Sequence, residues 1–171
     1  RRVFAAVSAK GERDPIEEIQ ILIGLNDQGD LSRKKLNPLI QDILNPTGAK
    51  VDGVAFRGGD KIICTGNGWY PVDGERANVT EFLANGEIGR IVSIDKLAFV
   101  AEFASIGEGK RRIRIPLKTE YAKSFELAYA ITCHKSQGSE WPVVVIIADD
   151  AAYRVCSREW WYTAVSRAKD R

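Results

Sequence analysis

A run of polar residues from Thr132 to Glu140 lies between two apolar segments and has the composition of a ligand-binding loop. In α/β proteins such loops follow buried strands and bind ligands at the edge of the sheet. Gly138 lets the backbone approach a phosphate or ribose closely, and Glu140 can accept a hydrogen bond from a ribose hydroxyl or order a metal-bound water. Phosphate oxygens can accept from Thr132, His134 and Lys135. A solvated loop whose serines cap a helix explains the same composition equally well.

Arg167 is a second candidate, in a segment from Tyr162 to Lys169 that has a helical pattern. A lone arginine on a helix is usually a surface charge. Apolar neighbours at helical spacing, Trp161, Ala164 and Ala168, would hold this one in place. A positioned guanidinium is a planar donor suited to phosphate.

A basic strand is expected over Lys110 to Lys118, where alternation places Arg112 and Arg114 on one face. Its opposite face carries Ile113 and Ile115. Such a strand can follow a nucleic-acid backbone. The alternative is an edge strand whose charges protect it against aggregation.

Several phosphate, metal and nucleophile motifs are absent. The sequence contains no G-x-x-x-x-G-K-[ST], no G-x-G-x-x-G after a strand, no H-E-x-x-H and no G-x-S-x-G. His134 is the only histidine, and Cys64, Cys133 and Cys156 form no C-x-x-C pair, so no metal site is expected. The chain therefore lacks the principal phosphate-binding element of a nucleotide hydrolase.

Composition indicates a soluble globular protein, with 171 residues, 44% hydrophobic residues, 28% charged residues and a net charge of +2. This balance excludes a histone-like polycation but permits a local nucleic-acid-binding patch. Three cysteines predict reduced thiols and a cytoplasmic location. The apolar runs are too short to span a membrane, and no signal peptide is recognisable. Without any Met and ending inside a helical pattern, the chain is expected to be a piece of a longer protein.

The elements that must position these residues follow an α/β pattern around an all-β insert. The flanks contain buried-type strands at Ile19–Leu25 and Val143–Ile147. Helical patterns cover three segments: Arg1–Ala9, Leu31–Leu44 and Arg158–Arg171. In the second segment one face carries Leu36, Leu39, Ile40, Ile43 and Leu44. In the third segment one face carries Trp161, Ala164, Val165 and Ala168. The insert contains four candidate strands at the spacing of a small antiparallel barrel or meander: Asp60–Thr65, Glu87–Asp95, Ala98–Ala104 and Arg111–Pro116.

Taken together, the two candidate sites resemble motifs of superfamily 1 DNA helicases. Ala128–Ile146 is similar to motif V and Trp160–Lys169 to motif VI of the RecD-like branch, which includes the alpha subunit of exodeoxyribonuclease V. The resemblance extends over almost the whole chain, because the motif IV region is similar to Ile19–Asn26 with Leu36–Pro46, and the branch's SH3-like insert is similar to Phe56–Ile63 with Asn85–Gly89.

The resemblance implies an α/β fold, a RecA-like P-loop-NTPase-type domain (2A) that lacks its own Walker A motif and carries an inserted small SH3-like β-barrel (2B). Domain 2A would comprise residues 1–55 and 119–171, and domain 2B residues 56–118. The implied activity is that of an ATP-dependent helicase translocating 5′ to 3′ on single-stranded DNA. ATP with Mg²⁺ would be bound mainly by a first RecA-like domain outside this sequence, so the fragment alone would be inactive. The resemblance also suggests nuclease or helicase subunits as further partners. No association with a membrane is expected.

Residue by residue, the resemblance implies that Arg167 is the arginine finger on the γ-phosphate. Nucleotide contacts would come from Gly138, Glu140 and Gln137, and DNA-backbone contacts from Thr132, His134 and Lys135. Ser166 stands where the family often has Thr, and a second arginine in motif IV is not identifiable. The competing hypothesis is a non-enzymatic DNA-binding or protein-docking module, in which the SH3-like insert acts alone through Arg112 and Arg114.

Overall fold

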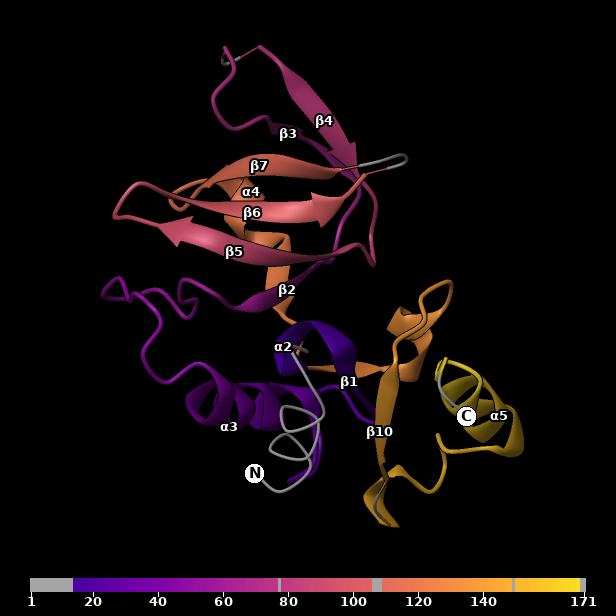
Figure 1. Cartoon of the computed structure of the whole chain (residues 1–171). Helices are drawn as coiled ribbons and strands as arrows, with labels where there is room; N and C mark the ends of the chain where they lie inside the picture. Colours follow the sequence, from indigo (N-terminus) through magenta and orange to yellow (C-terminus); the bar gives the residue numbers. More distant parts are fainter. Residues whose placement is uncertain (1–13, 77, 106–108, 149, 170–171) are drawn as a thin grey trace. The chain divides into compact units, whose positions relative to one another are not determined.

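The computed structural model describes residues 14–76, 78–105, 109–148 and 150–169. It divides the chain into two compact units. One unit is formed by the two flanks, up to Leu44 and from Tyr129 onward, and the other by residues 45–128. In Figure 1 the flanks are drawn in indigo and in orange to yellow, and the second unit runs from purple through magenta and salmon to orange at helix α4 (Glu120–Lys123). None of the helices in the described residues is both long and apolar enough to cross a membrane.

The first unit contains a three-stranded parallel sheet in the order β10-β1-β9. Its strands are β1 (Ile19–Ile23), β9 (Ala130–Thr132) and β10 (Val143–Ile147). Strand β1 is central and buried along its whole length, as its continuous apolar run predicts. Strand β10 lies at one edge and is only half-buried, although its sequence predicts burial on both faces. The mixed α/β pattern of the flanks is confirmed.

Helix α3 (Arg33–Leu44) buries polar residues that the sequence pattern does not predict, namely Arg33, Asn37 and Gln41. The predicted apolar face is confirmed only in part. Ile40 is buried and Leu36 and Leu44 are half-buried, whereas Leu39 and Ile43 are 59% and 43% exposed. Polar side chains point inward because this helix packs against the edge of a sheet, where backbone groups need hydrogen-bond partners.

Helix α5 (Arg158–Val165) begins at a serine N-cap, since Ser157 Oγ accepts from the Trp160 N–H at 3.3 Å. It buries Trp160 and Ala164 and leaves Trp161 and Val165 exposed. The helix ends before Arg167, so the predicted helix to Arg171 is too long over the described residues. The expected support of Arg167 by a continuous apolar helix face is accordingly wrong. Short helices among the described residues of this unit are α2 (Pro15–Glu18), η1 (Cys133–Ser136) and η2 (Asp150–Ala152).

The second unit contains a five-stranded antiparallel sheet in the order β7-β6-β5-β2-β8 and a two-stranded hairpin, β3-β4. The four predicted strands are confirmed within one or two residues as β2 (Lys61–Cys64), β5 (Ile88–Ile94), β6 (Ala98–Ala104) and β7 (Lys110–Pro116). Sequence analysis did not identify β3 (Gly68–Pro71), β4 (Thr80–Leu83), the short helix α4 (Glu120–Lys123) or β8 (Phe125–Leu127).

The predicted SH3-like barrel is not confirmed, because the described strands form no closed barrel. An isolated bridge between Val72 and Ile113 connects the segment after β3 with β7, but β8 at the far edge pairs only with β2. Aromatic side chains of β3, β6 and β8 pack together in the core of this unit. The Tyr70 and Phe125 rings lie 5.3 Å apart edge to face, and Phe125 also packs on Phe99 at 5.7 Å.

The second unit is wider than the predicted insert of residues 56–118. At its end, β8 pairs antiparallel with β2, with Ile62 opposite Leu127. At its start, Asn45 Nδ2 donates to the Asp60 carboxylate at 2.7 Å and to the Gly58 carbonyl at 2.9 Å. These long-range contacts tie both extensions to the antiparallel sheet.

Candidate functional site

The carboxyl ends of the three parallel strands meet at one edge of the first unit. The segments that follow β1 and β10 pack tightly there. A Cβ on Gly24 would lie 2.8 Å from the Ala152 Cβ and 3.0 Å from the Cys156 sulfur. A side chain at this position would force the segments apart, so glycine fixes the close approach. Such an edge is where open α/β sheets bind ligands.

The predicted polar loop begins directly after β9 as the 3₁₀ helix η1. Ser136 is fully buried, and its hydroxyl donates to the Cys133 carbonyl at 2.6 Å. The turn ends at Gly138, whose φ of +82° lies in the left-handed region that favours glycine. No atom within 4 Å would contact a Cβ there, so the backbone at Gly138 faces open space.

Arg167 is held at this loop by three oxygen acceptors. Its Nε donates to the Thr163 carbonyl and one terminal nitrogen to the Ser139 carbonyl, both at 3.3 Å. The other terminal nitrogen donates to the Ser166 hydroxyl at 3.0 Å. Among the described residues no carboxylate pairs with this guanidinium. Three of the five N–H groups of the guanidinium are engaged in these bonds, so the side chain keeps part of its donor capacity.

Backbone hydrogen bonds connect the same two segments. Trp141 donates its N–H to the Arg167 carbonyl at 3.0 Å and accepts from the Lys169 N–H at 2.9 Å. Trp141 is also buried against this unit. The loop after β9 and the segment after α5 therefore form one structural element around Arg167.

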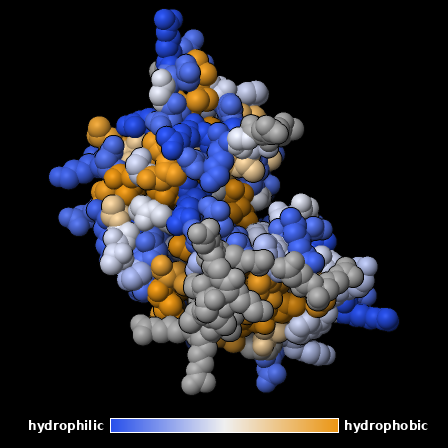
Figure 2. Space-filling model, in the orientation of Figure 1, coloured by the Kyte–Doolittle hydropathy of each residue, from blue (hydrophilic) through white to orange (hydrophobic). Residues whose placement is uncertain are grey.

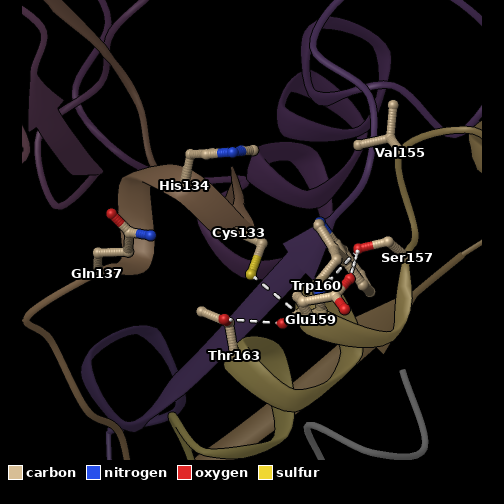
Figure 3. Close-up of a pocket in the computed structure, with 8 residues that line it drawn as sticks. All are labelled: Cys133, His134, Gln137, Val155, Ser157, Glu159, Trp160 and Thr163. Carbon is tan, nitrogen blue, oxygen red and sulfur yellow. Dashed lines mark hydrogen bonds between the residues drawn. The ribbon is translucent and has the colours of Figure 1, made fainter.

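A cavity of about 270 Å³ lies between η1 and the first turns of α5. Figure 3 shows its lining side chains, which come from both segments: Cys133, His134, Gln137, Val155, Ser157, Glu159, Trp160 and Thr163. At its α5 end the Ser157 hydroxyl donates to the Glu159 carboxylate at 2.7 Å, and this bond lowers the pKa of Glu159. The cavity wall thus combines polar side chains, one of them anionic, with the apolar side chains of Val155 and Trp160.

Burial raises the pKa of the Cys133 thiol, although the Ser136 hydrogen bond and the nearby Arg167 charge lower it in part. The sulfur lies 3.7 Å from the Trp160 carbonyl oxygen. A buried, neutral thiol is a packing residue and not a nucleophile. Sequence analysis did not single out this contact between η1 and α5.

The structure brings most of the predicted loop residues to one edge. His134, Gln137 and Glu140 are exposed, while Thr132 and Lys135 are half-buried. Gly138 lies in the same turn, and Arg167 is bound to the neighbouring Ser139. The predicted nucleotide and DNA contacts of motif V therefore belong to one continuous surface segment.

Arg112 and Arg114 belong to the other unit, on β7, which is an edge strand of the five-stranded sheet. Arg112 donates to the Glu102 carboxylate at 2.9 Å through Nε, and this bond with that of Lys110 lowers the pKa of Glu102. Over the face of this unit shown in Figure 2, hydrophilic residues are interspersed with hydrophobic ones. The Glu102 carboxylate therefore offsets part of the positive charge of β7.

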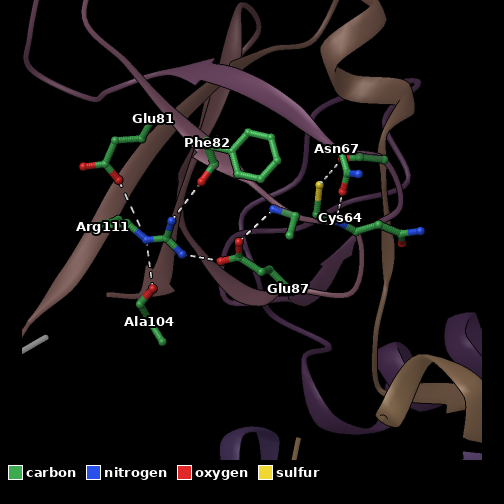
Figure 4. A network of polar contacts seen from close by, with 10 residues as sticks. Cys64, Asn67, Glu81, Phe82, Glu87, Ala104 and Arg111 are labelled. Carbon is green, nitrogen blue, oxygen red and sulfur yellow. Dashed lines mark hydrogen bonds and ion pairs between the residues drawn. The ribbon is translucent and has the colours of Figure 1, made fainter. Parts of the chain in front are cut away.

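Arg111 has a structural role that the sequence pattern did not suggest (Figure 4). Its guanidinium donates to the Ala104 carbonyl at 2.8 Å and the Phe82 carbonyl at 3.0 Å, and it forms an ion pair with Glu87. These bonds fasten the β3-β4 hairpin to β7. In the sequence, this role could have been suggested only by the alternation of the strand, which directs Arg111 and Arg112 to opposite faces.

No group of three or more potential metal ligands occurs in the described ranges. At the carboxyl edge of the parallel sheet, Arg167 supplies a cation and Ser157 and Thr163 supply hydroxyls, beside the carboxylates of Glu140 and Glu159. The cation and the hydroxyls suit an anionic phosphate ligand.

Residues 127–171 match the family model of the UvrD-like helicase C-terminal domain. The segment contains η1, the polar loop, α5 and Arg167. Similarity to a RecD-like DNA helicase extends over most of the chain. Over 155 residues, or 90% of its length, the chain is 27% identical to the ATP-dependent RecD2 DNA helicase of Deinococcus radiodurans. It is also 49% identical over 49 residues to an uncharacterized protein of Methanocaldococcus jannaschii.

Solved helicase structures share the fold. The Pif1 helicase from Bacteroides, in complex with ADP-AlF3 and ssDNA, has a TM-score of 0.50 and 14% identity, covering 96% of this chain and 42% of that one. The Candida albicans Pif1 helicase has a TM-score of 0.50 and 15% identity, covering 98% of this chain and 46% of that one. These similarities show a mixed α/β fold like that of superfamily 1 RecA-like domains.

The chain spans only 19% of the length of the RecD2 helicase that it matches.

Proposed function

We propose that this chain is the second RecA-like motor domain (2A) of an ATP-dependent DNA helicase that translocates 5′ to 3′ on single-stranded DNA, with residues 45–128 as its inserted β domain (2B). The observation that carries the proposal is the placement of Arg167. Its guanidinium is anchored by neutral oxygens at the carboxyl edge of a parallel sheet. In such a site the cation is positioned in advance, and no carboxylate among the described residues pairs with it.

Arg167 acts as an arginine finger in this proposal. ATP, when bound with Mg²⁺ by the first RecA-like domain, supplies the phosphoryl group that is transferred to water. Three donor groups of Arg167 are already engaged, and its remaining N–H groups are available to the γ-phosphate oxygens. An arginine supplied from a second domain acts only when the two domains close, which couples hydrolysis to movement.

The surroundings of Arg167 fit a nucleotide. Gly138 exposes its backbone to open space and leaves room for a ribose or phosphate. Glu140 is exposed, where its carboxylate can accept from a ribose hydroxyl, and Gln137 lies in the same turn. Together these residues provide donors and acceptors on one side of the arginine.

Thr132, His134 and Lys135 are proposed to contact the DNA backbone. They precede the proposed nucleotide contacts by only a few residues in one loop. A movement of this loop on nucleotide binding would therefore change the grip on the strand. The alternative of an autonomous DNA-binding insert has less support, because Arg112 is already paired with Glu102.

The test uses the longer protein in which a nucleotide-binding domain precedes this chain. Arg167→Ala is expected to lower single-stranded-DNA-stimulated ATP turnover by about 10³-fold or more while DNA affinity is retained. Unchanged turnover would refute the arginine-finger role. A titration of the present chain with a fluorescent oligothymidylate addresses the alternative: tight, salt-sensitive binding without the first domain favours the autonomous module.

A further inference from the structure

Asn37 is a buried polar residue in the middle of α3, only 2% exposed. Its side-chain amide pairs with the backbone of a single residue 93 positions away. Nδ2 donates to the Ala130 carbonyl at 2.8 Å, and Oδ1 accepts from the Ala130 N–H at 2.9 Å. Nδ2 also donates to the Arg33 carbonyl at 3.1 Å. A single side chain therefore satisfies both backbone groups of Ala130.

These bonds lie on the outer edge of β9. Strand β9 pairs with β1 on one side only, with Ile21 opposite Ala130. On that side the Ile21 N–H donates to the Tyr129 carbonyl. Because successive residues of a strand direct their backbone groups to opposite sides, the groups of Ala130 face away from β1. Asn37 thus takes the place of a missing neighbouring strand, at a point where buried backbone groups would otherwise lack partners.

The position of this contact is next to the proposed DNA-binding segment. Ala130 begins a strand of three residues, whose last residue is Thr132. Helix η1, which contains His134, follows without an intervening residue. Three residues give a strand little pairing of its own, so its alignment depends strongly on each added hydrogen bond.

Helix α3 is in turn fixed to the segment after β1. The Arg33 N–H donates to the Leu25 carbonyl at 3.0 Å, and Arg33 Nε donates to Asn26 Oδ1 at 2.7 Å. The helix therefore connects the carboxyl end of β1 with the start of β9. Its inward-facing polar residues explain why the apolar spacing of α3 predicted its buried face only in part.

We propose that Asn37 is a positioning residue for single-stranded DNA binding: it holds β9 in register so that Thr132 and His134 reach the DNA backbone together. This inference rests on the proposed function of the loop. Asn37 does not touch DNA or nucleotide itself. Its loss should therefore weaken DNA binding and leave the arginine-finger chemistry intact once DNA is saturating.

Two measurements test the inference. In the present chain, hydrogen exchange followed by NMR compares the Ala130 amide with the Val145 amide of β10 as an internal reference. Asn37→Ala should speed exchange at Ala130 relative to Val145 by about tenfold, the effect of one lost buried hydrogen bond. In the longer protein, it should raise the DNA concentration for half-maximal ATPase by about tenfold with little change in maximal turnover.

Ile40→Ala is the matched control, because Ile40 is buried on the same helix and contributes no polar atom. It should speed exchange at both amides alike and leave the DNA requirement near the wild-type value. Asn37→Gln keeps an amide but displaces it by one methylene, and serves if Asn37→Ala does not fold. The inference would be overturned if Asn37→Ala accelerated exchange at Ala130 and Val145 by the same factor. It would also be overturned if the Asn37 and Ile40 variants required the same DNA concentration for half-maximal ATPase. If the wild-type ATPase does not respond to DNA, the proposed function fails, while the exchange ratio still decides whether Asn37 holds β9.

Discussion

Trp141 and Arg167 are joined by a backbone hydrogen bond of 3.0 Å, and the guanidinium of the same arginine reaches the Ser139 carbonyl two residues before the tryptophan. Backbone and side chain of Arg167 thus both contact the loop that follows β9. This arrangement fixes the direction of the guanidinium relative to the loop. It explains how an arginine beyond the end of α5 can be well positioned, since its side chain contacts both the last turn of the helix and the loop.

The first prediction concerns the shape of this cation. Arg167→Lys keeps the charge but cannot reproduce donors to Thr163, Ser139 and Ser166 in one plane. We expect ATP turnover of the longer protein to fall nearly as far as in Arg167→Ala. The measurement is steady-state ATPase at saturating single-stranded DNA, with DNA affinity as the control. Turnover within twofold of wild type would show that charge alone suffices.

A second prediction concerns the turn at Gly138. Because its φ is +82° and no atom would contact an added Cβ, the cost of Gly138→Ala comes from backbone conformation alone. We expect a loss of about 1 kcal/mol in the free energy of unfolding, measured with urea. Gly138→Asn should lose less, since asparagine enters the left-handed region more readily than alanine. Equal stability of all three proteins would contradict the strain at this turn.

Sequence patterning was sufficient for the regular strands and for the composition of the site. Alternation and β-branched runs located β1, β10 and the long strands of the insert, because burial on one or both faces leaves that signature. The polar loop and Arg167 were recognised from residue type, order and family resemblance. Their proximity agrees with the rule that ligands bind at the carboxyl edge of parallel strands.

Long-range polar contacts could not be read from the sequence. Asn37 looks like an exposed helix residue until its partner Ala130 is known, and its burial shifts the buried face of α3 away from Leu39 and Ile43. Strand β8 was missed because three residues give no measurable alternation. Whether the sheet of the insert closes into a barrel depends on whether its edge strands β7 and β8 pair with each other. The local sequence pattern of a strand does not determine its pairing partners.

A third prediction concerns thiol reactivity. Cys64 and Cys133 are buried, whereas Cys156 is half-buried. Burial also raises the pKa of Cys133, so little thiolate is present at neutral pH. With Ellman's reagent, Cys156 should react first and the other two thiols at the rate of unfolding. Cys156→Ser should remove the fast phase, and a persistent fast phase would contradict the described burial.

The last prediction concerns the pH dependence of the insert. Glu102 accepts from Arg112 and Lys110, which lowers its pKa below the ordinary value of 4.5. A carboxyl with a depressed pKa in the folded state stabilises the protein above its unfolded pKa, and this contribution is lost as the pH falls through the folded pKa. The Arg112 side chain is 59% exposed, so the pair contributes under about 1 kcal/mol.

Arg112→Ala should therefore raise the pKa of Glu102 toward its ordinary value, as followed by carboxyl NMR titration. The variant should lose more stability at neutral pH than at pH values below the folded pKa, where Glu102 is protonated in both proteins. Arg114→Ala is the matched control, since Arg114 lies on the same strand and its charge acts on Asp95 instead. If both substitutions shift Glu102 equally, the effect arises from the general charge of β7 and not from the Arg112 hydrogen bond.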